Sequence, residues 1–405
     1  MSKLRFIYIT MFVVVFVLSG QNCAAIQIER LSAIAIFECK NYAQAIPLLD
    51  NLIAKFPDDK ELYIFRGTAH LKTKNYLNAL ADFKNAESFN FSQALLNQAR
   101  TFALNQQFDL AENCLMKHLS QKDKVLQSEI YADSCFFAMK RSMEWKNIWV
   151  KNWYSPNEIT LNEYLIEKNN QNMIEAYDIL SRAIESKVNI SERFYYERAI
   201  LNFSLYEFKF ALEDIEKALQ LKKNQKEFHF LKAAILMALG KTKESAELYE
   251  IALKKWPYEI KEIEKYINVL MVLKELDKAS EWSKILLNAN SDNATFIFIQ
   301  GKIFFQATEF LMALELFNKC IQINPRNAHY YYYRGLTYNQ SNSYDLAIHD
   351  FSASLDIQPT YHEAYLQRGI SKQKLNKNLE ACIDFQLAAK NGIREAYNFM
   401  DENCN

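Results

Sequence analysis

The sequence predicts an all-α fold, an α-solenoid superhelix of stacked helix–turn–helix units. Three segments of the C-terminal half share one pattern, and they begin 34 residues apart, at Ala294, Ala328 and His362. Self-similarity at this period is typical of arrays in which each repeat is a pair of helices. The chain also has only 7 glycines and 6 prolines among 405 residues, fewer than a sheet protein needs for its turns and bulges.

Each of these segments has the same internal plan. The first helix carries a small residue near its middle, namely Gly301, Gly335 and Gly369. The second helix carries a small residue near its start and a large one four positions later: Ala313 and Phe317, Ala347 and Phe351, Ala381 and Phe385. The small residues let two antiparallel helices approach closely, and the phenylalanines fill the remaining space. Pro325 and Pro359 follow the second helix, where they end it and redirect the chain.

This pattern resembles that of the tetratricopeptide repeat family, and the same frame extends back through the chain in about eleven units. It predicts three units over residues 26–125, a degenerate aromatic-rich unit over 126–156 and seven units over 157–395. In the degenerate unit the frame predicts one helix over 128–143 and an aromatic helix over 144–153, ended by Pro156. Residues 396–405 are expected to form a capping helix and tail, because a terminal repeat exposes a face that a neighbour would otherwise cover.

The charge balance argues against a nucleic-acid partner. Lys plus Arg equals Asp plus Glu, at 48 each, so the formal net charge is zero. Binding to phosphates usually needs a surplus of basic residues. Half of the residues are apolar and 24% are charged, a balance that is ordinary for a folded protein.

The N-terminus predicts an export signal. Lys3 and Arg5 precede an apolar run over 6–18, and small residues follow it. The run is shorter than the roughly 20 residues of a membrane-spanning helix, so we expect no stable transmembrane segment after cleavage. Cleavage after Ala25 fits the small-x-small rule, and cleavage near Gly20 is the alternative. A periplasmic or cell-envelope location, or secretion, would follow.

Cys23 leaves a second reading of the N-terminus open. Lipidation of this thiol would associate the protein with a membrane. The preceding residues, Gly20, Gln21 and Asn22, match the usual Leu-small-small-Cys pattern poorly.

The sequence contains no sign of catalytic, cofactor or metal chemistry. The glycines are used by close packing, turns and the export signal, so none remains for a phosphate-binding loop. The six histidines are dispersed, and no pair has the spacing of metal ligands on one helix. We therefore expect a non-enzymatic protein without a cofactor.

Two cysteine pairs have a spacing that allows disulfides. In Cys114–Cys135 and Cys382–Cys404 the first residue lies early in a second helix and the other late in the following first helix. Antiparallel neighbours bring such positions together, within the roughly 4.4–6.8 Å between Cα atoms that a disulfide needs. Alternatively these cysteines only fill small packing positions, as Cys320 does.

Trp145, Trp149 and Trp153 are spaced by four residues and would form one stripe on a helix. A stripe of this kind is more often part of a core than a binding surface. Because the surrounding unit is irregular, an exposed contact site is the alternative.

In the family that the chain resembles, first helices line a concave groove that holds an extended peptide or a partner helix. The corresponding positions here are largely apolar: Tyr196, Ile200, Phe203, Phe230, Phe298, Phe305, Tyr332, Leu336 and Leu366. The family's clamp for a C-terminal carboxylate uses Lys and Asn. The matching positions hold Arg30 with Ile34, Tyr332 with Leu336 and Leu366 with Ile370, so the clamp is missing and apolar anchors are favoured.

The resemblance therefore implies a scaffold that binds other proteins in a cell envelope. An accessory subunit that sequesters an enzyme is the alternative from another class. A hydrolase that uses acidic residues of the groove is a third reading, with no specific motif to support it.

Overall fold

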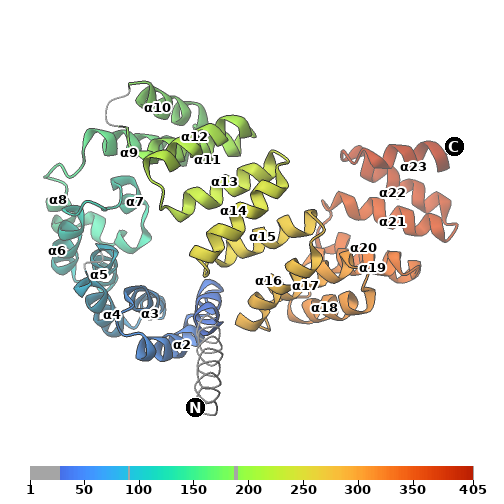
Figure 1. Cartoon of the computed structure of the whole chain (residues 1–405), viewed down its shortest axis with the longest axis horizontal. Helices are drawn as coiled ribbons and strands as arrows, with labels where there is room; N and C mark the ends of the chain where they lie inside the picture. The colour runs from blue at the N-terminus through green and yellow to red at the C-terminus, as the bar shows by residue number, and fades with distance from the viewer. Residues whose placement is uncertain (1–27, 90–91, 187–189, 405) are drawn as a thin grey trace, which may run out of the picture. The chain divides into compact units, whose positions relative to one another are not determined.

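The computed structural model describes residues 28–89, 92–186 and 190–404, and every regular element in these ranges is helical (Figure 1). The expected all-α solenoid is confirmed. The chain divides into two compact units, Met1–Glu262 and Ile263–Asn405. The export signal predicted at 1–25, including Cys23, lies outside the described residues.

In the first unit, a helix over residues 28–38 precedes a series of antiparallel pairs. The helices before the irregular region are α2 (Tyr42–Lys55), α3 (Lys60–Lys72), α4 (Tyr76–Ser88), α5 (Ser92–Leu104) and α6 (Phe108–Leu119). Those after it are α9 (Pro156–Asn169), α10 (Met173–Ser186), α11 (Glu192–Ser204), α12 (Phe208–Leu221), α13 (Lys226–Ala238) and α14 (Thr242–Lys255). In α2–α6 and in α9–α14, each helix packs on the one that follows it, and α6 packs on the irregular region.

Helix α15 (Ile260–Val272) spans the boundary between the units. The second unit continues with α16 (Leu276–Ala289), α17 (Ala294–Gln306), α18 (Phe310–Ile323), α19 (Ala328–Gln340), α20 (Tyr344–Ile357), α21 (His362–Lys374) and α22 (Asn378–Lys390). The single helix α23 (Glu395–Asn403) packs on α22 as a cap. The ring of Phe399 stacks on that of Phe385, with 5.1 Å between centroids.

An arginine–aspartate pair ties the two helices of several repeats together. The Arg334 guanidinium donates from Nε and Nη2 to the two carboxylate oxygens of Asp350, each at 2.7 Å. Its Nη1 donates to Asn318 of the preceding repeat, also at 2.7 Å. The same pairing, sixteen residues apart, joins Arg66 to Asp82, Arg198 to Asp214 and Arg368 to Asp384. One side chain thus links three consecutive helices.

The irregular region of the first unit departs from the prediction of two helices. It forms α7 (Gln127–Ala132), two short 3-10 turns, Ser134–Phe136 and Met139–Arg141, and α8 (Met143–Ile148). The interruptions have a local cause, because Asp133 and Ser142 take extended backbone and cap the following turns with their side chains. Ser155 does the same with Glu158 in a capping box before Pro156.

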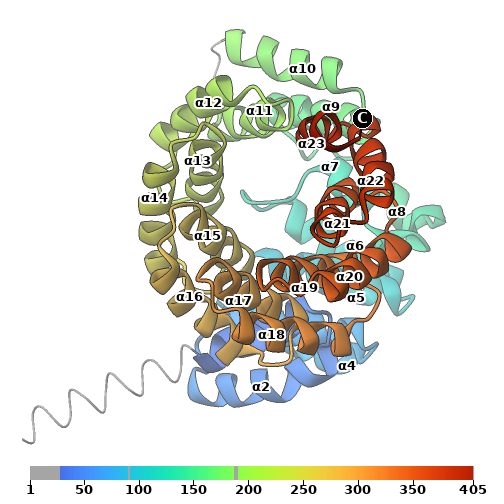
Figure 2. The same ribbon diagram turned by 90° about the vertical axis from the view of Figure 1, so that its right-hand side faces the viewer.

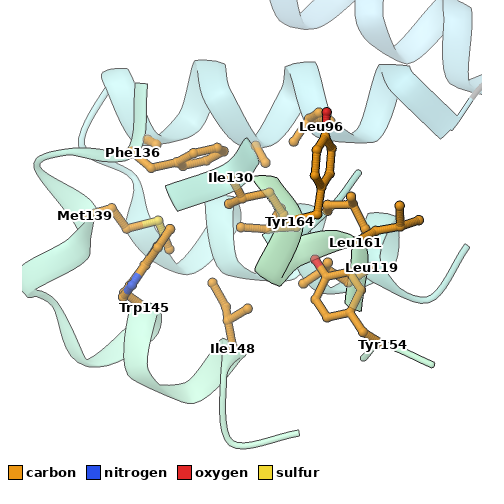
Figure 3. Packing of buried hydrophobic residues seen from close by; sticks show 14 of the residues in the cluster. Leu96, Leu119, Ile130, Phe136, Met139, Trp145, Ile148, Tyr154, Leu161 and Tyr164 are labelled. Carbon is orange, nitrogen blue, oxygen red and sulfur yellow. The ribbon is translucent and has the colours of Figure 1, made fainter. Parts of the chain in front are cut away.

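These short elements are held together by one apolar cluster. Phe136, Met139, Trp145 and Ile148 point inward toward Leu96 and Leu119 of the regular pairs (Figure 3). Tyr154 closes the other side and donates from its hydroxyl to the Val125 carbonyl at 3.1 Å. The region therefore keeps a buried core although its helices are broken.

The first unit also curves back on itself. The guanidinium carbon of Arg30 lies 4.7 Å from the centre of the Tyr258 ring. Lys226 pairs with Glu259 next to this contact. Burial raises the pKa of Glu38 on the same helix, and nearby Lys261 opposes the rise. The first repeat of this unit is thus in contact with its last residues.

Candidate functional site

The first helices form the inner side of the curve in the first unit. Figure 2 shows α11 and α13 inside and their partners α12 and α14 outside. Successive first helices thus present their side chains side by side, which is the arrangement needed to hold an extended chain or a helix. This inner face is one candidate site, and the first helices of the second unit are another.

The predicted groove residues fall into two groups. Seven of them are half-buried, so part of each side chain stays accessible: Tyr196, Ile200, Phe203, Phe298, Phe305, Tyr332 and Leu336. Phe230 and Leu366 are buried instead, and their assignment to the groove is wrong. Phe230 packs on the rings of Tyr249 and Trp256, and Leu366 belongs to the cluster beneath the cap.

Aromatic side chains form a continuous surface on α17 and α19 of the second unit. Phe298 contacts Tyr330 and Tyr333, with ring centroids 5.0 and 5.2 Å apart. The ring centroid of Tyr332 lies 4.6 Å from that of Tyr361. Burial raises the pKa values of Tyr332 and Tyr361, so both stay neutral and serve as apolar surface with a hydroxyl tip.

A lysine lies among these rings without an ion pair. The Lys302 ammonium lies 5.5 Å from the Phe298 ring centre and donates to the Asn268 side chain at 3.4 Å. Burial lowers the pKa of Lys302, and Glu264 opposes the shift only partly. Within the described part of the chain, no carboxylate is within ion-pair distance of it. The sequence reading missed this residue because it looked for the family's clamp at other positions.

Arg30, at a position matching the clamp, is already engaged. It pairs with Asp59, and its other terminal nitrogen donates to Glu61 at 2.9 Å. The remaining clamp positions, Tyr332 with Leu336 and Leu366 with Ile370, have no cationic group.

The three tryptophans do not lie on one helix. Helix α8 ends at Ile148, so Trp149 is its C-cap and Trp153 lies in the segment leading to α9. Trp145 is buried, while Trp149 and Trp153 are half-buried against the same cluster. The Trp153 indole N–H donates to the Ile148 carbonyl at 2.7 Å. These residues serve the core of the irregular region.

The cysteines separate into one bonded pair and free thiols. Cys382 and Cys404 form a disulfide with 5.6 Å between Cα atoms, which ties the capping helix to α22. Cys114, Cys135 and Cys320 are free thiols. Burial raises the pKa values of Cys114 and Cys135 to about 11.

Over the ranges that the structure describes, no group of three or more His, Cys, Asp or Glu side chains could hold a metal ion. No helix in the same ranges is long and apolar enough to cross a bilayer.

Two stretches match models described as tetratricopeptide repeat, over residues 40–92 and 328–361. The chain therefore contains tetratricopeptide repeats. Arrays of this family typically serve as non-catalytic scaffolds that bind other proteins. No curated protein matches the sequence.

Solved structures of the same family resemble the chain at low identity. A tetratricopeptide repeat protein from Parabacteroides merdae superposes with a TM-score of 0.55 at 16% identity, covering 59% of this chain and 96% of that one. This likeness shows the fold alone. YrrB, described as having an unusual peptide-binding site, superposes with a TM-score of 0.36 at 22% identity, covering 46% of this chain and 95% of that one. The Cut9–Hcn1 hetero-tetramer superposes with a TM-score of 0.45 at 11% identity, covering 91% of this chain and 88% of that one.

Proposed function

We propose that this protein is an exported, non-enzymatic scaffold that binds partner peptides or helices on the inner faces of its repeat units in a cell envelope. The observation that carries the proposal is the half-buried aromatic surface of α17 and α19. Phe298, Phe305 and Tyr332 contribute rings that neighbours cover only in part. Such rings supply large contact areas at small entropic cost, as hot-spot residues do in protein interfaces.

Lys302 makes the expected partner more specific. A cation among aromatic rings costs desolvation unless an anion meets it. A guest that offers apolar side chains and a carboxylate would cover the rings and pair with this lysine. The proposed guest is therefore an apolar peptide or helix with an acidic residue or a free C-terminus.

Binding assays with partners captured from the native envelope test this function. Phe298→Ala and Tyr332→Ala should each weaken a captured partner at least tenfold, whereas Leu379→Ser on the exposed face of α22 should leave its affinity unchanged. If the partners bind all three variants equally, the inner face of the second unit is ruled out as their binding site. A captured set dominated by one enzyme whose activity falls on binding would favour the accessory-subunit alternative.

Export is tested separately. The purified native protein should begin after Ala25, or near residue 20, and should fractionate with the envelope or the medium. A mature chain that begins at Cys23 with an added lipid mass would identify a lipoprotein. A chain that retains Met1 and stays with cytoplasmic markers would contradict export.

A further inference from the structure

We propose a second binding surface on the first unit, a hollow between α10 and the α11–α12 turn that takes an apolar side chain flanked by a basic residue of a partner protein. The hollow has a volume of about 370 Å³. Met173 and Ile174 line it from α10, and Leu205 and Phe210 line it from the turn and α12. It is separate from the inner face on which the proposed function rests.

The walls of this hollow include large apolar side chains that are accessible. Ile174 is 79% exposed, Phe210 55% and Leu205 48%. Single exposed apolar residues are common on protein surfaces, but a contiguous group around a depression indicates a contact site. The volume suits one or two side chains of a partner, such as a leucine or a phenylalanine.

The turn beside the hollow carries a further exposed aromatic residue. Tyr206 is 81% exposed and adopts a left-handed backbone with φ of 64°. The equivalent turn of the next repeat has Gly240 in this conformation, with φ of 75°, and other repeats use Lys, Gln, Thr or Asn there. A bulky aromatic residue is disfavoured in the left-handed region. Its ring extends the apolar surface from Phe208, 6.0 Å away between centroids.

The charges around the hollow indicate which partner fits. Asp178 and Glu207 line it, and no basic residue does. Among the residues that the structure describes, neither carboxylate takes part in an ion pair, whereas the neighbouring Glu175 is paired with Arg182 at 2.7 Å. A lysine or arginine beside the apolar anchor would therefore meet two unpaired acceptors. Complementary charge of this kind mainly sets specificity and the rate of association.

A peptide library displayed on phage and panned against the purified protein tests this proposal without a known partner. Among the enriched sequences we expect a class with an aliphatic or aromatic residue next to Lys or Arg. Synthetic peptides of this class should bind Ile174→Ser and Phe210→Ser at least tenfold more weakly than the wild type. The double variant Asp178→Asn, Glu207→Gln should weaken them severalfold and reduce the salt dependence of binding.

The matched control is Leu77→Ser. Leu77 is the second residue of α4, as Ile174 is of α10, and it is 81% exposed, but it does not line the hollow. This variant should bind the peptides like the wild type, and circular dichroism should show all variants folded. The proposal would be overturned if the enriched peptides bound Ile174→Ser and Phe210→Ser with the same affinity as the wild type. So would a dimer in sedimentation that these substitutions dissociate, because the occupant would then be a second copy of the chain.

Discussion

The ring of Phe351 lies directly against the backbone of Gly335. A Cβ atom added to this glycine would stand 2.9 Å from Cε1 of the phenylalanine. The same relationship, at 2.6 Å, joins Gly67 to Phe83, Gly301 to Phe317 and Gly369 to Phe385. Four repeats thus use the absence of a side chain in the first helix to accommodate a phenylalanine of the second.

Other repeats balance the same two positions, sixteen residues apart, with different side chains. Where the first position is alanine, the second is usually a smaller aliphatic residue, as in Ala33 and Leu49, Ala99 and Leu115, and Ala199 and Ile215. Ile267 is followed by Ser283, so the large and small members are exchanged. Ala233 with Tyr249 departs from the trend. Since interiors are close-packed, the two helices keep their separation only if the summed volume is roughly conserved.

Gly335→Val should therefore destabilise the protein by about 3 kcal/mol, because the added carbons must displace a buried ring. Urea unfolding followed by circular dichroism would measure the change. The second substitution Phe351→Leu in the same chain should restore about half of the loss, since it vacates the space that valine needs. Gly335→Val alone with an unchanged unfolding midpoint would contradict the close contact.

The arginine–aspartate pairs give a prediction about buried charge. Arg334→Leu leaves the buried Asp350 carboxylate without its bidentate partner and should cost about 3–5 kcal/mol. Replacing both residues by leucine should recover most of this loss, because no unpaired charge remains buried. The free energy of unfolding of the single and double variants would show the difference.

The exposed pair Arg182–Glu175 is the control for this experiment. Arg182→Leu should change stability by less than about 1 kcal/mol, as surface ion pairs do. If Arg334→Leu were equally mild, the pairs would not be a structural requirement of the repeat.

The 34-residue period of the sequence predicted the array, but it did not predict interactions between side chains on adjacent helices. The sixteen-residue spacing from Arg66, Arg198, Arg334 and Arg368 to an aspartate is present in the sequence, but each pair joins two different helices, and the pattern within either helix does not reveal it. Phe230 and Leu366 were assigned to the groove because the frame fixes the position on the helix and not the rotation of the neighbouring repeat. The prediction of two helices in the irregular region was wrong for another reason. Asp133, Ser142 and Ser155 act as N-caps and start new turns, although the helical period continues through them. A prediction based on the repeat pattern gives little weight to such single residues.

The Cys382–Cys404 disulfide should stabilise the C-terminal cap by about 3 kcal/mol, the value typical for a bridge that closes a loop of this length. Reduction should lower the thermal midpoint of the second unit and raise the amide exchange of α23. In Cys404→Ser the midpoint should already be low, and a reductant should have no further effect. An equal response of this variant and the wild type to reductant would show that the bridge does not act on the cap.

The half-buried thiols of Cys114 and Cys135 should react slowly with alkylating reagents. With pKa values raised to about 11, Cys114 and Cys135 are about 0.1% ionised at pH 8, and the thiolate is the reactive form. Iodoacetamide should modify both half-buried residues slowly at pH 8, and their rates should rise with pH toward 11 or after unfolding. Mass spectrometry of the digested protein would measure each rate. Fast labelling of Cys114 at pH 8 would mean that this helix pair opens readily.

The last prediction concerns Lys302, whose charge is retained at a cost. Its pKa is lowered in the folded chain, so folding is opposed by desolvation while the lysine is protonated. The penalty is fully present below the folded pKa and disappears as the pH rises through the folded value toward the unfolded one. Lys302→Met should therefore raise the thermal midpoint at pH 7, and this gain should shrink when both proteins are measured near pH 10.

Lys374 is the matched control, since it is an exposed lysine of a first helix in the same unit. Lys374→Met should give a small effect without this pH dependence. A residue that lowers the stability of the free protein can be retained because it contributes to binding. Lys302→Met should accordingly weaken guests that present a carboxylate more than guests in which that group is amidated. If both kinds of guest lose the same affinity, the lysine contributes only its aliphatic stem to the surface.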